Sequence, residues 1–169
     1  LIFGGSPAAT ATEEFNGSTW SSGGAMTIGA FWRMCAGFQD SAVAIGGRTN
    51  GTIANVEQYD GSAWSAGTSA PIARFGGAVF GNANDLVNTA GYEVNGTSYT
   101  DTTLYDGNTW SQGNSSLSTA GYTSFGLGSS STQGARIGGY GPAYVSCVEE
   151  YNGLTWAFVN QFPNTVSIT

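Results

Sequence analysis

The sequence predicts an all-β chain of 169 residues, built from about four repeated units of four antiparallel strands each. Three observations support this prediction: a hexapeptide containing tryptophan recurs, a pair of small residues recurs in step with it, and no helical pattern is present. The composition agrees with a folded chain. Aromatic residues make up 13% and charged residues 9%, the reverse of what intrinsically disordered chains contain.

The hexapeptide runs aromatic, Asn or Asp, Gly, two variable residues, Trp. Its tryptophans are 44, 46 and 46 residues apart, the period of a β-propeller blade with four short strands. Asx-Gly is a strong hairpin signal, and it places the aromatic residue and the tryptophan on one face of the sheet. We expect these pairs to pack between neighbouring blades as the repeat core. They are Phe15 with Trp20, Tyr59 with Trp64, Tyr105 with Trp110, and Tyr151 with Trp156.

The second element is a pair of small residues that ends a short apolar run: Gly4-Gly5, Gly46-Gly47, Ala90-Gly91 and Gly138-Gly139. The last residue of each pair precedes the next repeated tryptophan by 15, 17, 19 and 17 residues. Steps of two preserve strand register, because a shift of one residue would turn every side chain to the other face. One unit parses into strands at 75–80, 85–90 and 100–105 and a last strand through Trp110. No window has a capped 3.6-residue apolar period, so no helix is expected.

We predict a single propeller domain over residues 1–169. The chain begins at a second strand, so residues 1–20 form a partial blade. A C-terminal strand within 157–169, at Asn164–Thr169, is predicted to complete that blade and to close a ring of four. The alternative is a larger ring, in which this sequence is a segment of a longer chain.

These motifs resemble the kelch repeat, in which a double glycine ends the second strand and a tryptophan lies on the last strand. Pro71-Ile72-Ala73-Arg74 also resembles the family's Pro-x-x-Arg element before the innermost strand. Two departures are that Ala90 stands where the family has glycine and that the Pro-x-x-Arg element is not repeated. The resemblance implies a propeller but not a function, because kelch propellers serve both as enzymes and as binding modules.

The short units rich in Gly, Ser, Thr and Asn are also similar to repeats in virion proteins of tailed, particularly marine, bacteriophages. That resemblance implies a particle-surface fibre, decoration or tail-associated protein that meets the host envelope.

The net charge and the types of side chain present disfavour several classes of function. The net charge is −7 with four arginines and no lysine, which disfavours nucleic acid as a partner. No apolar run is long enough for membrane insertion. The chain has no histidine, the commonest general base and metal ligand, so we expect no enzymatic activity, metal or cofactor. Glu13, Glu57 and Glu149 share one repeat position, which favours a structural role over a catalytic one. The two cysteines are expected to be small buried thiols.

The loops that follow the small-residue pairs carry the candidate ligand-binding residues. Aromatic and amide side chains on loops over a rigid scaffold suit sugar or protein recognition. The alternative is that they cover strand edges or pack against neighbouring subunits. The candidates are Arg48, Tyr92, Asn95, Tyr99, Tyr140 and Tyr144.

We therefore predict a non-enzymatic virion structural or surface protein that mediates assembly or host-surface contact. Its expected partners are other virion proteins or a host-surface glycan or protein, and a homo-oligomer is compatible with the sequence. The alternative is a secreted or periplasmic bacterial kelch-type domain that binds protein or glycan. A polysaccharide-active enzyme on the same scaffold comes third.

Overall fold

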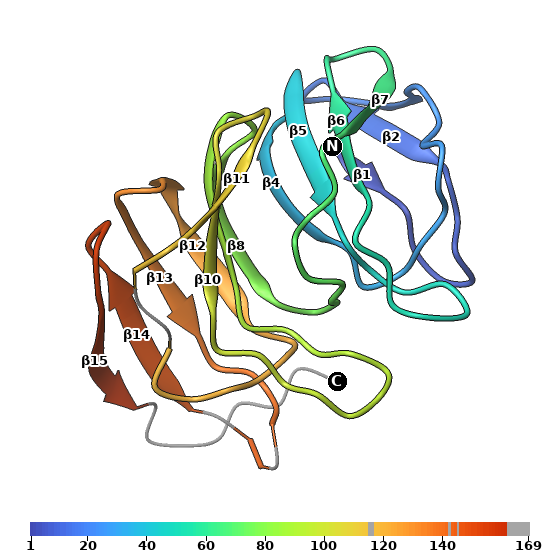
Figure 1. Ribbon diagram of the computed structural model, residues 1–169. Coiled ribbons are helices and arrows are strands. Elements are labelled where there is room, and N and C mark those ends of the chain that lie inside the picture. Colours follow the sequence, from blue (N-terminus) through green and yellow to red (C-terminus); the bar gives the residue numbers. More distant parts are fainter. Residues whose placement is uncertain (115–116, 142, 145, 162–169) are drawn as a thin grey trace.

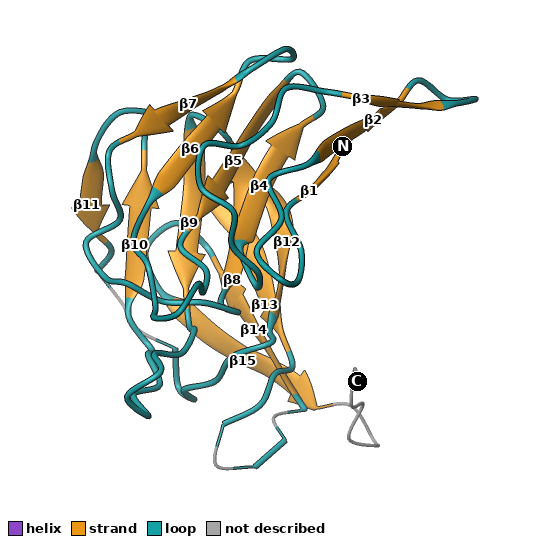
Figure 2. Cartoon of the chain, turned by 90° about the vertical axis from the view of Figure 1, so that its right-hand side faces the viewer, coloured by secondary structure: helices purple, strands orange, loops and turns teal. Residues whose placement is uncertain are grey.

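The computed structural model describes residues 1–114, 117–141, 143–144 and 146–161. This described part of the chain contains β-strands and no helix (Figure 2). The predicted all-β fold is confirmed. The strands form four antiparallel sheets that follow one another in chain order along an arc, with β1–β3 at one end and β12–β15 at the other (Figure 1). We call these sheets blades 1 to 4.

Blades 2, 3 and 4 each contain four strands in sequential order, and blade 1 contains three. In blade 1 the strands are β1 (Ile2–Phe3), β2 (Thr12–Phe15) and β3 (Trp20–Ser22). In blade 2 they are β4 (Met34–Phe38), β5 (Ser41–Ile45), β6 (Val56–Tyr59) and β7 (Trp64–Gly67). In blade 3 they are β8 (Ala78–Asn82), β9 (Asp85–Thr89), β10 (Thr102–Tyr105) and β11 (Trp110–Gln112). In blade 4 they are β12 (Phe125–Ser130), β13 (Gln133–Ile137), β14 (Cys147–Tyr151) and β15 (Trp156–Gln161).

The first strands of blades 2, 3 and 4 lie next to one another, with β8 in contact with both β4 and β12. Backbone hydrogen bonds join the segments that lead into them: Gly76 N–H donates to Trp32 O (3.2 Å), and Ser124 N–H donates to Gly76 O (3.3 Å). The blades are therefore tied together on their inner side by backbone as well as by side-chain packing.

The Asx-Gly hexapeptide forms a four-residue turn between the last two strands of every blade. The glycine after each Asx has a φ between +91° and +96°, a conformation that L side chains rarely adopt. The Asx side chain accepts hydrogen bonds of 2.6–2.9 Å from the backbone N–H groups two and three residues later. This turn sets the register, so that each aromatic residue lies directly opposite its tryptophan, with ring centroids 4.7–5.0 Å apart.

The hydrophobic core consists of the layers between consecutive blades. Tyr59 and Trp64, 3% and 7% exposed, pack against blade 1. Tyr105 and its partner Trp110 pack against blade 2. Tyr151 and Trp156 in turn pack against blade 3, in a cluster that includes Phe80.

The remaining pair differs from the prediction. Phe15 and Trp20 contact each other but are 39% and 51% exposed, because no sheet precedes blade 1 in the described part of the chain. Their position in the repeat is the predicted one, and their burial is not.

The cysteine prediction holds for one of the two thiols. Cys147 is buried, but Cys35 on β4 is exposed. Its counterpart one blade later, Val79, packs against blade 2, so Cys35 faces blade 1. That blade lacks the innermost strand that would cover it.

The range 157–169, within which the closing strand was predicted, divides into two parts. Residues 157–161 belong to β15 and pair with β14 in blade 4, so they do not complete blade 1. Backbone pairing along the whole of β14 accounts for this placement. Residues 162–169, with the predicted strand Asn164–Thr169, lie outside the described residues. No closure of the ring is seen among the residues that the structure describes.

Candidate binding surface

Seven aromatic side chains form an unbroken row of ring contacts across blades 2, 3 and 4. Neighbouring ring centroids in the row are 4.6–6.3 Å apart, which is the range of favourable aromatic pairs. We call this row the aromatic ridge. It consists of Phe31, Trp32, Phe75, Tyr92, Tyr122, Tyr140 and Tyr144.

The backbone that presents the ridge repeats from blade to blade. In blades 2, 3 and 4 the residue after the small-residue pair forms an isolated antiparallel bridge to an aromatic residue in the segment that leads into the blade. The glycines that precede the bridge have φ values of +104° to +127°, which only glycine adopts readily. The bridges join Phe31 to Arg48, Phe75 to Tyr92, and Tyr122 to Tyr140.

The side chains of the ridge are most buried at its centre and most exposed towards its two ends. Phe75 is 2% exposed and contacts Trp32, Tyr92 and Tyr122, so it is the packed centre. Trp32 and Tyr144 are each 54% exposed, and Tyr140 is 37% exposed. The ridge therefore presents ring surface to solvent from a base that is held in the core.

Trp32 is also held in an unusual backbone conformation. Its φ is +55°, close to the +64° of Gly76, which occupies the same place one blade later. Thr123, the equivalent residue of blade 4, has a φ of +54°. The left-handed conformation is therefore a feature of the repeated backbone, and it turns the chain directly after the bridged aromatic residue of each of these three blades.

Arg48 adds a positive charge to the ridge. Its guanidinium carbon lies 5.9–6.0 Å from the ring centroids of Phe31, Trp32 and Phe75, within cation–π range. The three ion pairs among the described residues use the other three arginines. Arg48 therefore keeps guanidinium N–H donors available for a ligand.

Four of the six sequence candidates belong to this surface, namely Arg48, Tyr92, Tyr140 and Tyr144. The structure does not bring the other two into the row of rings. Tyr99 lies under the guanidinium of Arg74 (5.8 Å) and donates a hydrogen bond to Glu93. Asn95 is exposed in the β9–β10 loop, where its side chain accepts a bond from the N–H of Thr97.

Sequence reasoning missed Phe31, Trp32, Phe75 and Tyr122. A signal for three of them was present, since Phe31, Phe75 and Tyr122 follow the repeated tryptophans by 11, 11 and 12 residues. This third periodic aromatic position was obscured because the segments between blades otherwise look like irregular loops.

The other arginines form buried ion pairs, one in each of blades 2, 3 and 4. Arg33 pairs with Glu57, and Arg136 pairs with Glu149 (3.0 Å), with at most 3% of any of these side chains exposed. In blade 3 Arg74 binds both oxygens of Asp101 (3.0 Å) and the hydroxyl of Thr103, the residue that replaces glutamate at this repeat position.

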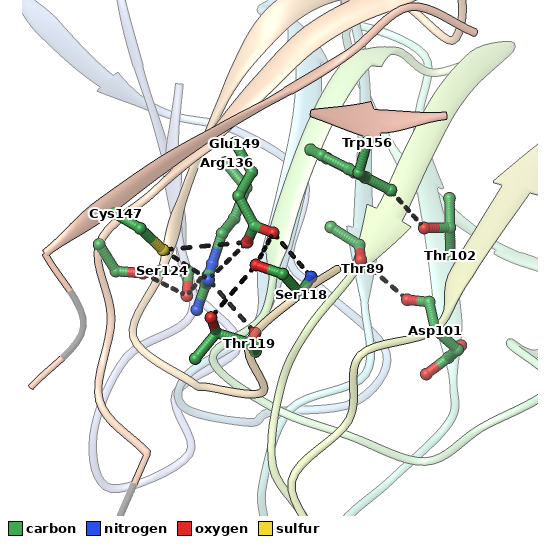
Figure 3. A network of polar contacts seen from close by, with 11 residues as sticks. Thr89, Asp101, Thr102, Ser118, Thr119, Ser124, Arg136, Cys147, Glu149 and Trp156 are labelled. Atoms are coloured by element: carbon green, nitrogen blue, oxygen red, sulfur yellow. Dashed lines mark hydrogen bonds and ion pairs between the residues drawn. The ribbon is translucent and has the colours of Figure 1, made fainter. Parts of the chain in front are cut away.

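Figure 3 shows the site in blade 4. The carboxylate of Glu149 accepts bonds from Arg136 (3.0 Å) and from the N–H and hydroxyl of Ser118 (2.7 and 2.6 Å). In blade 2 Glu57 has the same set of donors, with Thr27 in place of Ser118. Burial alone would raise the pKa of Glu57, but the hydrogen bonds from Thr27 and Arg33 outweigh it and lower this pKa.

Two further observations concern metal-binding groups and membrane-spanning helices. The described residues contain no group of three or more His, Cys, Asp or Glu side chains that could hold a metal ion. No helix long and apolar enough to cross a membrane occurs in the described part of the chain.

Comparison with known proteins gives a likeness of fold. No protein-family model matches the chain, and no curated protein matches it. A solved structure titled "Structure of YjhT", a protein of the propeller type, matches with a TM-score of 0.70 and 17% identity, over 89% of this chain and 52% of that one. The chain has a propeller-like fold. It spans about half the length of that solved structure, and at this identity the likeness shows the fold alone.

The propeller-like fold places the ridge on one face of the arc of blades, where strand ends and loops meet, and not at either end of the arc. Strands alternate in direction. The loops between the second and third strands therefore lie on the same face of the arc as the segments that join one blade to the next. All seven ridge residues and Arg48 lie in those loops and segments. The Asx-Gly turns lie on the opposite face of the arc.

Proposed function

We propose that this protein is a non-enzymatic recognition protein of a virion surface, which binds a saccharide of the host envelope through the aromatic ridge. The observation that supports this proposal is the exposure of Trp32, Tyr140 and Tyr144 along the ridge. Arg48, which has no ion-pair partner among the described residues, lies beside the first of these rings.

The chemistry of the ridge suits a sugar. One face of a pyranose ring presents C–H groups, which pack well on the electron-rich face of an aromatic ring. Arg48 supplies charged N–H donors for the ring oxygens, hydroxyls or carboxylate of such a ligand. Aromatic surface for orientation with a few polar groups for specificity is the usual composition of small-ligand sites.

The contacts of four carboxylates fit a protein that binds a ligand without catalysis. Glu57 and Glu149 are bound by arginine and by hydroxyl and backbone donors within their own blades. Asp60 and Asp106 accept bonds from their own turns. These contacts favour structural roles for all four groups.

The virion setting comes from the similarity of the repeats to those of tailed-bacteriophage proteins. The alternative is a secreted or periplasmic kelch-type domain with the same binding surface. Mass spectrometry of purified phage particles and of the host's periplasmic and extracellular fractions distinguishes the two. The chain is expected in the particles, and its presence only in the cell fractions would favour the alternative.

The binding proposal is tested on an array of neutral and acidic bacterial envelope glycans. Trp32→Gly and Tyr144→Ala are each expected to weaken binding by about tenfold, the loss of one stacking contact of about 1.4 kcal/mol. Leu154→Ala is the matched control, because Leu154 is 61% exposed but lies in the β14–β15 turn, on the face opposite the ridge.

Two outcomes would contradict the proposal. If the unmodified chain binds no saccharide on the array, the ligand class is wrong. If a saccharide binds equally well to both ridge variants, its site lies elsewhere on the protein.

A further inference from the structure

The chain contains four Asn-Gly sequences, which the sequence alone makes equivalent sites of deamidation. Asparagine reacts most readily before glycine, because glycine has no Cβ to shield its backbone nitrogen and leaves the backbone free to rotate. The sites are Asn16-Gly17, Asn50-Gly51, Asn95-Gly96 and Asn152-Gly153. Differences in reactivity among them must therefore come from the fold.

Three of the four asparagines are held in turns by their own side chains. The carboxamide oxygens of Asn16 and Asn152 each accept two hydrogen bonds of 2.8–2.9 Å from backbone N–H groups of the turn that follows. The oxygen of Asn95 accepts one from the N–H of Thr97 (2.9 Å), and the N–H of the glycine after Asn95 donates to a carbonyl oxygen (3.0 Å). Deamidation at these sites has to break such bonds, which raises its barrier.

Asn50 lacks these restraints. It is exposed in the loop between β5 and β6, and no hydrogen bond to its side chain or to the N–H of Gly51 is found in the described part of the chain. A Cβ added to Gly51 would meet no atom within 4 Å. The side-chain carbonyl carbon and the nitrogen that attacks it are therefore free to approach each other.

We propose that Asn50 is a site of spontaneous deamidation in the folded protein and that the fold protects the other three asparagines. The backbone nitrogen of Gly51 gives its proton to water and attacks Cγ of Asn50. A bond between this nitrogen and Cγ forms, the Cγ–Nδ2 bond breaks, and the side-chain nitrogen takes up a proton from water and leaves as ammonia. Water then opens the cyclic imide at one of its two carbonyl carbons, which gives aspartate or isoaspartate.

The product alters the charge of the candidate binding surface. Arg48 and Thr52 form the bridge at the base of the hairpin whose tip is Asn50. Adjacent Cα atoms are about 3.8 Å apart, so the new carboxylate is attached within about 8 Å of the Arg48 backbone, close to one Debye length at physiological ionic strength. Arg48 is the arginine that lies outside the ion pairs of the described residues, and the chain has no lysine. Deamidation of Asn50 would therefore offset the accessible positive charge of this surface, although the reaction itself does not depend on the saccharide site.

Peptide mapping by mass spectrometry measures the reaction, because the four arginines place each Asn-Gly sequence on a different tryptic peptide. These peptides are 1–33, 49–74, 75–136 and 137–169. The folded chain is kept in mildly alkaline buffer and sampled over time, and the conversion found in the starting sample is subtracted. Asn50 is expected to convert at least about tenfold faster than Asn16, Asn95 or Asn152, the effect of the hydrogen bonds on the barrier.

Two controls separate the effect of the fold from that of the sequence. In concentrated urea the four sites are expected to convert at similar rates, because the turns are lost. In the folded chain Gly51→Ala is expected to slow conversion at Asn50 by about tenfold, since a Cβ shields the attacking nitrogen and restricts the backbone. The φ of Gly51 is outside the left-handed region and a Cβ has room there, so the melting temperature of this variant should match that of the unmodified chain.

The proposal is overturned if Asn16 or Asn152 converts as fast as Asn50 in the folded chain. It is equally overturned if Asn50 keeps its higher rate in urea, or if Gly51→Ala leaves the rate at Asn50 unchanged.

Discussion

Trp64 of blade 2 donates a hydrogen bond from its indole nitrogen to the hydroxyl of Thr12 of blade 1, 2.8 Å away. Trp156 makes the same bond to Thr102 two blades later, at 2.7 Å. Trp110 lies between them in the chain and faces Val56 at the equivalent position. It bonds instead to the carbonyl oxygen of Thr68 (2.8 Å). The repeated tryptophans thus join the blades through a polar contact as well as through their apolar surface.

Replacing Trp64 with alanine is expected to lower the free energy of unfolding by roughly 3–5 kcal/mol, because a large buried aromatic is lost. The matched change Trp20→Ala should cost less than about 1 kcal/mol, since Trp20 is 51% exposed. Urea unfolding at a concentration where the chain is monomeric measures both. Equal losses would contradict the assignment of Trp64 to the core.

Glu57 and Glu13 offer a second matched pair, because they occupy the same repeat position in blades 2 and 1. Glu57→Gln leaves the buried guanidinium of Arg33 without its counter-charge, and should destabilise the chain by roughly 3–5 kcal/mol. Glu13 is exposed, so Glu13→Gln should change stability by no more than about 0.5 kcal/mol. Denaturant midpoints give the comparison, and a neutral Glu57→Gln would show that the ion pair is not formed.

Stability is expected to fall in acid. The pKa of Glu57 is lowered in the folded chain, and those of Asp60 and Asp106 are lowered by backbone hydrogen bonds in their turns. Groups with lowered pKa values contribute stability above their ordinary range, near pH 4, and that contribution is lost as the pH falls through the folded-state values. Melting temperatures should decline steadily below about pH 4.5. The decline should be shallower in Glu57→Gln, and a parallel decline would exclude Glu57 as a contributor.

Ala90 has a φ of +58°, the value that Gly46 and Gly138 adopt at the same position of their blades. A left-handed alanine costs about 1–2 kcal/mol, so Ala90→Gly is expected to raise stability by about 1 kcal/mol after the entropy of the glycine is included. In contrast, Gly46→Ala should lower it by roughly 2–4 kcal/mol, because the new Cβ would lie 2.3 Å from the carbonyl oxygen of Arg74. Thermal unfolding measures both, and opposite signs are the expected result.

Much of the fold was predictable because the relevant interactions are local. The hexapeptide contains its own turn, and the register of Tyr59 opposite Trp64 follows from the length of that turn. In blade 3 the second strand was predicted at 85–90 and runs over Asp85–Thr89. The first strand begins three residues later than predicted, since Phe75 forms the isolated bridge to Tyr92 instead.

What could not be predicted depends on contacts between distant segments. The exposure of Phe15 and Trp20 depends on what packs against blade 1, and their own hexapeptide carries no information about that. The ridge depends on rings from three blades that meet only after the arc is formed. Arg33, Arg74 and Arg136 come from unlike repeat positions, so their shared role, each pairing with a carboxylate of its own blade, is visible only in three dimensions.

Each of these arginines finds its acidic partner inside its own blade, and none crosses to a neighbour. A gene segment that encodes one blade therefore carries both charges of its buried pair. Duplication, deletion or exchange of such a segment would leave no orphaned charge behind, so the number of blades can change during evolution while the internal electrostatics of those that remain stay intact.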